Sequence, residues 1–191
     1  LMDIVDKEFL FKQYLYMTSA SKPIVDHFKK YALEIHKKYL KKIDNPLVIE
    51  IGSNDGSLLH EFKKLGSNVI GIEPAKNIAK IAISGGIPTE NKFLNDKIAK
   101  KISKNKKATL IVANNVIGHI DNLHEFMECI KLLLSDKGIL VFEVPYVVDL
   151  IQKSEFDTVY HEHLSYFALG PLKKLMNNNE FEIFDVIKQK V

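Results

Sequence analysis

The feature that most constrains this chain is a regular alternation of short, apolar, β-branched runs with amphipathic segments of helical period. The runs at 47–51, 68–72 and 108–113 have the length and the valine and isoleucine content of strands that are buried on both faces. Strands that alternate with helices in this way predict an α/β fold, in which helices cover both faces of a mostly parallel sheet.

The remaining elements follow from periodicity and from Gly and Pro turn signals. A helix is predicted over 21–42, where Pro23 provides a start signal and apolar residues recur every three or four positions from Ile24 to Tyr39. Further helices are predicted near 57–65, 75–84, 96–103, 123–134 and 172–176, and further strands near 88–91, 139–144 and 180–187.

Length and composition narrow the class of protein. The chain has 191 residues, about one large domain, and a formal net charge of +3, which is too balanced to indicate a nucleic-acid surface. The lysine-rich run at 97–107 lacks interleaved aromatic residues and is predicted to be a solvated surface. The single cysteine, Cys129, suits a buried helix face in a protein of a reducing compartment. We therefore expect a cytoplasmic, monomeric, small-molecule enzyme with no nucleic-acid partner and no membrane contact.

A glycine loop follows the first predicted strand. Gly52 and Gly56 permit close approach of a ligand to the backbone because they lack a Cβ and tolerate positive φ. In open α/β sheets such ligands lie at the carboxyl ends of the strands. Glu73 ends the second strand, near the separation of about 20 residues that is typical of a carboxylate binding ribose hydroxyls.

Two residues of this region disfavour a dinucleotide. Asn54 stands where dinucleotide-binding loops carry their middle glycine, and Glu50 would repel a pyrophosphate. A carboxylate there suits the positively charged amino-acid moiety of S-adenosylmethionine (SAM) better. A nicotinamide-dependent enzyme is therefore the least favoured of the alternative functions.

The motif Glu50-Ile51-Gly52-Ser53-Asn54-Asp55-Gly56 resembles the first motif of the class I methyltransferases. The resemblance implies a Rossmann-like core at 46–191, truncated at its C-terminal hairpin, and an N-terminal helical segment at 1–45 that covers the cofactor and substrate cleft. It implies SAM as cofactor, with S-adenosylhomocysteine (SAH) as product. The implied cofactor-binding residues are Glu50, Gly52, Asn54, Asp55, Gly56, Ser57, Glu73, Pro74, Asn77, Asn114, Asn115 and Val116.

A second dense motif lies at 155–167, where Tyr160, His161, Glu162 and His163 follow one another. A structural histidine pair or a metal site are alternative interpretations. Metal is not expected, because a firm zinc site takes three or four ligands and no further cluster is evident.

Together with 14–21, 71–79 and 114–120, this motif resembles the sugar C-methyltransferases, which act on nucleotide-linked keto-deoxysugars. In that family a thymidine-diphosphate 4-keto hexose is typically methylated at C3, beside the ketone. Its members usually carry a cysteine-rich zinc-binding domain before the segment at Tyr14 and a further domain after the last strand. We therefore expect an excised core or a reduced homologue.

Methylation of a carbon beside a ketone requires an enolate, and hence a general base and a partner for the enolate oxygen. By resemblance, His163 is the base, and Tyr160 and His119 orient the sugar or stabilise the enolate. Tyr14 and Glu162 complete the pocket. Two alternatives stay open: an O- or N-methyltransferase, for which the His-Glu-His cluster would be incidental, and a cofactor-binding module without catalysis.

Overall fold

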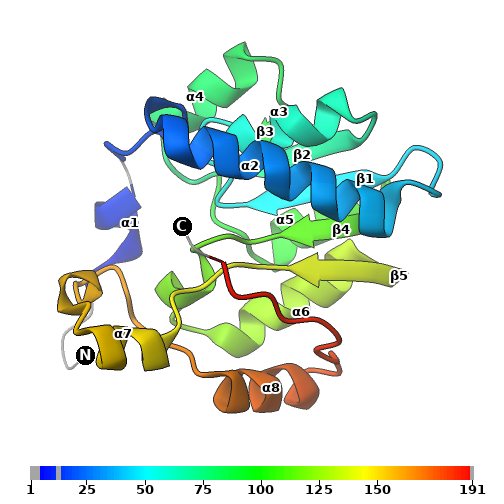
Figure 1. Cartoon of the computed structure of the whole chain (residues 1–191). Coiled ribbons are helices and arrows are strands. Elements are labelled where there is room, and N and C mark those ends of the chain that lie inside the picture. Colours follow the sequence, from blue (N-terminus) through cyan, green and yellow to red (C-terminus); the bar gives the residue numbers. More distant parts are fainter. Residues whose placement is uncertain (1–4, 12–13, 190–191) are drawn as a thin grey trace.

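The computed structural model describes residues 5–11 and 14–189 and confirms the predicted α/β class (Figure 1). Five strands form one parallel sheet in the order β3-β2-β1-β4-β5. Their bounds are β1 Leu47–Ile51, β2 Asn68–Ile72, β3 Thr89–Glu90, β4 Ala108–Val112 and β5 Leu134–Val141.

Helices cover both faces of the sheet, because successive side chains of each buried strand point to opposite sides. Val48 packs with helices α2 and α3, whereas Leu47 and Ile49 pack with α5, α6 and α8. The helices are α1 (Lys7–Phe11), α2 (Lys22–Ile35), α3 (Ser57–Lys64), α4 (Lys76–Ser84), α5 (Asp96–Ser103), α6 (Leu123–Leu133), α7 (Val147–Lys153) and α8 (Leu169–Asn178). Cys129 is buried on α6, as predicted.

Several boundaries differ from the predictions. The helix predicted over 21–42 consists of α2 and a π-helical turn, η2 (His36–Leu40). β5 begins before its predicted start and ends at Val141, so that residues 142–144 follow the strand. Helices α1 and α7 were not predicted. Residues 1–4 and 12–13 of the predicted N-terminal segment and residues 190–191 of the predicted core lie outside the described residues.

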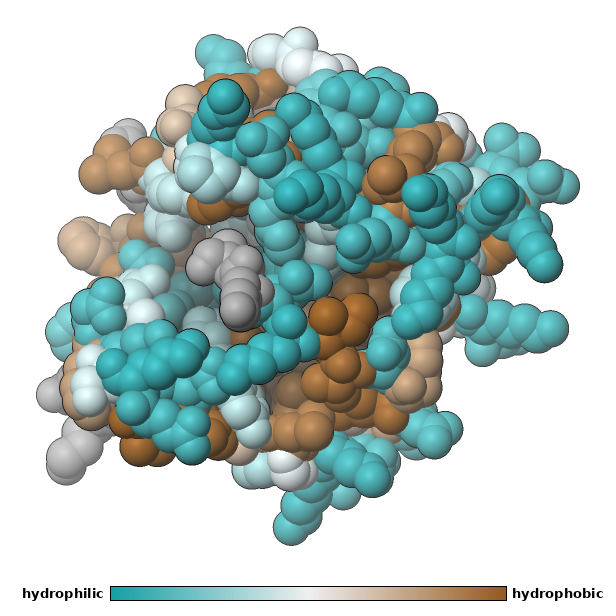
Figure 2. Space-filling model, in the orientation of Figure 1, coloured by the Kyte–Doolittle hydropathy of each residue, from teal (hydrophilic) through white to brown (hydrophobic). Residues whose placement is uncertain are grey.

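The strand predicted at 180–187 is wrong: these residues pair with no strand of the described chain. The alternating sequence has strand propensity, but a strand also needs a neighbour for its backbone hydrogen bonds. The segment instead runs beside η2, where Asp185 accepts hydrogen bonds from Lys38 and Tyr39. Phe184 and Val186 remain more than half exposed, and apolar side chains gather over this segment in Figure 2.

The order of the strands sets the location of the site. The chain builds outward from β1 through β2 to β3, then returns to β4 and β5 on the other side of β1. This reversal opens a crevice at the carboxyl ends of β1 and β4, where open α/β sheets bind ligands.

Within the described residues, no helix has the length and apolar content needed to cross a membrane.

Candidate active site

The loop after β1 and the loop after β4 meet at the floor of a large cleft. Gly52 has φ +66°, and a Cβ built on it would lie 2.6 Å from Cγ2 of Val116. Gly56, at the N-terminus of α3, has φ +79°. L side chains rarely adopt either conformation. The glycines that the sequence singles out are therefore required by the backbone.

Two buried carboxylates stand beside this floor. The side chain of Glu50 is buried and its Oε2 has no hydrogen-bond partner; burial raises its pKa well above the usual range, and the charges of Asp55 and Glu73 add to the effect. Glu73 is held by two backbone N–H groups, Asn54 to Oε2 at 2.9 Å and Ala75 to Oε1 at 2.8 Å. Burial raises the pKa of Glu73 and these hydrogen bonds oppose it.

These carboxylates meet the chemical requirements of SAM. An ammonium group would supply the hydrogen bond and the positive charge that Glu50 lacks, and each oxygen of Glu73 retains a second lone pair for a hydroxyl. Both residues line the cleft, as do Gly52, Asn54, Pro74, Asn114, Asn115 and Val116.

Other predicted cofactor residues hold the N-terminal segment in place. The carboxylate of Asp55 accepts hydrogen bonds from the Ser19 N–H at 2.8 Å and from the Ser57 hydroxyl at 2.6 Å. The side-chain amide of Asn77 exchanges two hydrogen bonds with the backbone of Tyr14. Asp55, Gly56, Ser57 and Asn77 are not among the residues that line the cleft, and their role as cofactor contacts stays a prediction.

A polar network that we did not predict joins α2 to the sheet. Oδ1 of Asn114 accepts hydrogen bonds from the Tyr31 hydroxyl at 3.0 Å and from the Glu143 N–H at 3.1 Å. Nε2 of His27 lies 3.0 and 3.2 Å from the two carboxylate oxygens of Glu143. His27 and Tyr31 are four residues apart and so share one face of α2. This spacing was visible in the sequence, but their partners lie 83 and 116 positions away.

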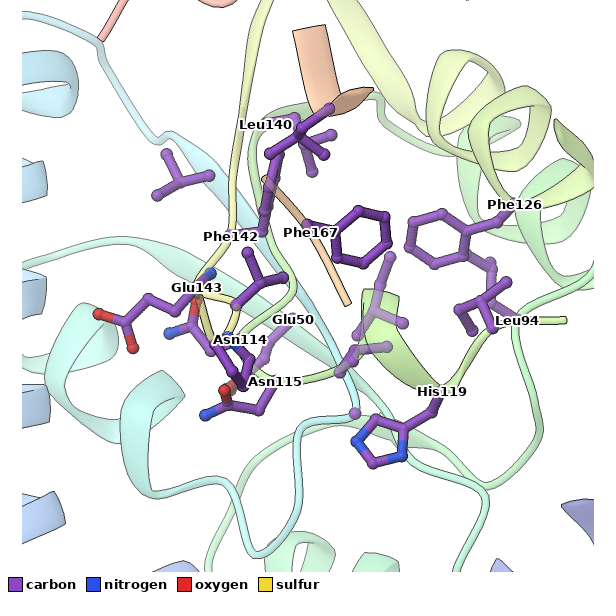
Figure 3. Close-up of a pocket in the computed structure, with 18 of the residues that line it drawn as sticks. Glu50, Leu94, Asn114, Asn115, His119, Phe126, Leu140, Phe142, Glu143 and Phe167 are labelled. Atoms are coloured by element: carbon purple, nitrogen blue, oxygen red, sulfur yellow. Dashed lines mark hydrogen bonds between the residues drawn. The ribbon is translucent and has the colours of Figure 1, made fainter. Parts of the chain in front are cut away.

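The wall of the cleft is divided chemically (Figure 3). Glu50, Asn114, Asn115 and Glu143 form a polar side, whereas Leu94, Phe126, Leu140, Phe142 and Phe167 form an apolar side, and the His119 ring stands at one end. Such a division, with a few polar groups among apolar ones, is typical of small-molecule sites.

His163 is held in one tautomer. Its Nδ1 lies 2.8 Å from the backbone oxygen of Thr158, and its Nε2 lies 3.3 Å from the Tyr160 hydroxyl. Because a carbonyl oxygen can only accept, Nδ1 must carry the hydrogen, and Nε2 is then the acceptor nitrogen of the neutral ring, to which the Tyr160 hydroxyl donates. The geometry is that of an oriented base.

The remaining predicted catalytic residues surround His163. The His119 ring meets the His163 ring edge to face, with centroids 4.9 Å apart. Burial, and then the charge of His163, lower the pKa of His119 to about 4. The Tyr14 hydroxyl donates to Glu162 at 3.4 Å, and burial raises the pKa of this phenol.

The structure thus brings the five predicted catalytic residues together, at two depths. Tyr14 and His119 line the cleft itself. His163 lines a small adjoining crevice, which His119 also lines, and is only 9% exposed. Tyr160 and Glu162 lie in the same loop, beside His163 and Tyr14 respectively. Among the described residues no group of three or more His, Cys, Asp or Glu side chains is arranged to hold a metal.

The chain belongs to the methyltransferase domain family, which matches residues 25–186. This membership and the fold make it a class I SAM-dependent methyltransferase domain. A curated relative, "C-methyltransferase NovU" of Streptomyces niveus, is 32% identical over 97% of this chain and 44% of that protein. A ubiquinone biosynthesis O-methyltransferase of Rhodopseudomonas palustris is 27% identical over 56% of this chain and 43% of that protein. The chain therefore spans less than half the length of these relatives.

Solved structures share the fold. A SAM-dependent methyltransferase from Archaeoglobus fulgidus superimposes with a TM-score of 0.60 at 17% identity, over 79% of this chain and 68% of that one. The plantazolicin methyltransferase BpumL, solved with SAH and a triazolic desmethylPZN analogue, gives 0.62 at 16% identity, over 84% of this chain and 65% of that one. At these identities the similarity concerns the fold alone.

Proposed function

We propose that this domain methylates a carbon next to the ketone of a nucleotide-linked keto-deoxysugar, through an enolate. The observation that carries the proposal is the oriented base His163, held by Thr158 beside the cleft. The similarity to a relative named as a C-methyltransferase, which extends over 97% of the chain, also supports it.

The donor would lie across the floor of the cleft. Gly52 allows its close approach to the backbone, Glu50 would bind its ammonium group, and Glu73 would accept hydrogen bonds from ribose hydroxyls. Bound SAM supplies an electrophilic methyl group on a sulfonium. The residues around the acceptor sugar must then generate the carbon nucleophile that attacks this methyl group.

On the acceptor side the chain must make a carbon nucleophile. Nε2 of His163 takes the proton from the carbon beside the ketone, and the Tyr160 hydroxyl, which lies 3.3 Å from this nitrogen in the free chain, turns from it to orient the sugar. With a pKa of about 4, His119 stays neutral at pH 7 and can donate a hydrogen bond to the enolate oxygen without losing its proton. The Tyr14 phenol likewise stays protonated, because burial raises its pKa.

The competing function is methylation of an acceptor oxygen, which requires no enolate; the similarity to the ubiquinone biosynthesis O-methyltransferases favours it. The two are separated by incubating the chain with SAM labelled with ¹³C on the methyl group and a thymidine-diphosphate 4-keto-deoxyhexose. Nuclear magnetic resonance then locates the label. A methyl carbon bonded to a ring carbon supports the proposal, whereas a methoxyl signal contradicts it.

A further inference from the structure

Helix α2 contacts the carboxyl ends of β4 and β5 through two side chains one turn apart. Tyr31 bonds Asn114, two residues after the end of β4, and His27 bonds Glu143, two residues after the end of β5. The backbone N–H of Glu143 donates to the oxygen that Tyr31 also contacts, and the His27 and Tyr31 rings lie 5.7 Å apart. The four residues therefore form a closed ring, which we call the α2 clamp.

The α2 clamp determines which way the amide of Asn114 points. Both of its hydrogen-bonded neighbours are donors, so both must meet the oxygen Oδ1. The Tyr31 phenol is buried and remains a donor at every ordinary pH, because burial and then the charge of Glu143 raise its pKa. The Asn114 amide cannot flip without placing its NH₂ group against these two donors.

This orientation leaves two complementary groups without partners. Nδ2 of Asn114 is a buried donor with no acceptor, and Oε2 of Glu50 is a buried acceptor with no donor. Glu50 pairs in register with Val112, and both side chains face α2. Asn114, two residues beyond Val112, faces the same helix because its side chain bonds Tyr31. Unpaired buried groups of this kind are costly, and a ligand that carries both an acceptor and a donor would satisfy them.

We propose that Tyr31 is a positioning residue of the donor site, which orients the Asn114 amide to bind the carboxylate of the methionyl end of the donor while Glu50 binds its ammonium. His27 supports it by holding Glu143, the second donor to Asn114. The inference rests on the proposed donor site. It adds a contribution from helix α2, which precedes the first strand in the chain. It does not depend on the identity of the acceptor.

The test measures the affinity of the chain for SAH by titration calorimetry, so that no turnover is required. Removing one hydroxyl in Tyr31→Phe keeps the ring in its packing and leaves only the Glu143 N–H to hold the amide, and we expect about fivefold to tenfold weaker binding. Asn114→Asp keeps both acceptor contacts but lacks the NH₂ group, and we expect a larger loss, of about tenfold or more. Tyr39→Phe removes a phenol that bonds Asp185 instead and should bind as the wild type does.

A double-mutant cycle separates positioning from general loosening of the helix. If Tyr31 acts through Asn114, then adding Tyr31→Phe to Asn114→Ala changes the affinity no further. The same fivefold loss in both backgrounds would overturn the positioning role, as would unchanged affinity of Tyr31→Phe. If the wild-type chain itself does not bind SAH, the donor site fails, and the role of Tyr31 with it.

Discussion

Gly52 and Val116 come so close that a methyl group on the glycine would lie 2.6 Å from Cγ2 of the valine. The contact joins the loop after β1 to the loop after β4, on the two sides of the crevice where the strand order reverses. Because Gly52 also has φ +66°, the positions of both loops depend on the absence of a side chain there.

Gly52→Ala should therefore lower the free energy of unfolding by ~1–3 kcal/mol, from backbone strain and displacement of Val116. Binding of SAH should weaken more than tenfold. Urea unfolding and calorimetry measure the two effects. The matched control is Gly170→Ala in α8, where a Cβ meets nothing within 4 Å and stability should be unchanged or higher. Equal losses in both variants would show that the Val116 contact is irrelevant.

Replacing Glu50 should have opposite effects on the stability of the fold and on cofactor binding. Burial raises its pKa, so the unfolded chain ionises this group first, and the folded state loses stability as the pH rises above the unfolded value. Glu50→Gln removes this cost and should raise the free energy of unfolding at pH 7. The same change should weaken SAH binding at least tenfold. A variant that is both less stable and binds normally would contradict this account.

Protonation of His119 should lower the stability of the fold at acid pH. Its pKa is about 4 in the folded chain, below the ordinary histidine value of about 6.5, so the unfolded chain takes up the proton first as the pH falls. Stability is full above about pH 7 and declines towards pH 4, by ~2 kcal/mol at pH 5 from this residue. Urea unfolding at pH 7.5 and pH 5 should show a smaller difference for His119→Gln than for the wild type. An identical difference would mean that His119 titrates normally.

The sequence predicts the interior of the sheet better than its edges. β1, β2 and β4 are mostly apolar because both of their faces are largely buried, and such runs can be recognised without knowing their partner strands. In β5 the first residue, Leu134, is followed by polar residues beside a register shift, so the sequence pattern does not reveal where this strand starts. The segment 180–187 has the alternation of a strand, but whether it pairs depends on a neighbour that its own residues do not specify.

The residues of the candidate site also differ in how well the sequence predicts them. Local motifs predicted the glycine loop and the cluster around His163, because the chemistry lies within a few consecutive residues. The apolar spacing from Ile24 to Tyr39 includes Tyr31, and nothing near Tyr31 in the sequence reveals that its hydroxyl meets Asn114. The α2 clamp depends on contacts that only the folded chain makes.

The most direct test of the central claim follows the proton that His163 is proposed to remove. The chain is incubated in deuterated water with SAH and a thymidine-diphosphate 4-keto-deoxyhexose, so that no methyl group can transfer, and exchange at C3 is monitored by nuclear magnetic resonance. We predict exchange well above the rate without protein, and a loss of about 100-fold or more in His163→Gln, with SAH affinity retained. Exchange that is unaffected by His163→Gln would contradict the enolate mechanism. So would methyl transfer in a parallel incubation with SAM if the incubation with SAH shows no exchange at this carbon.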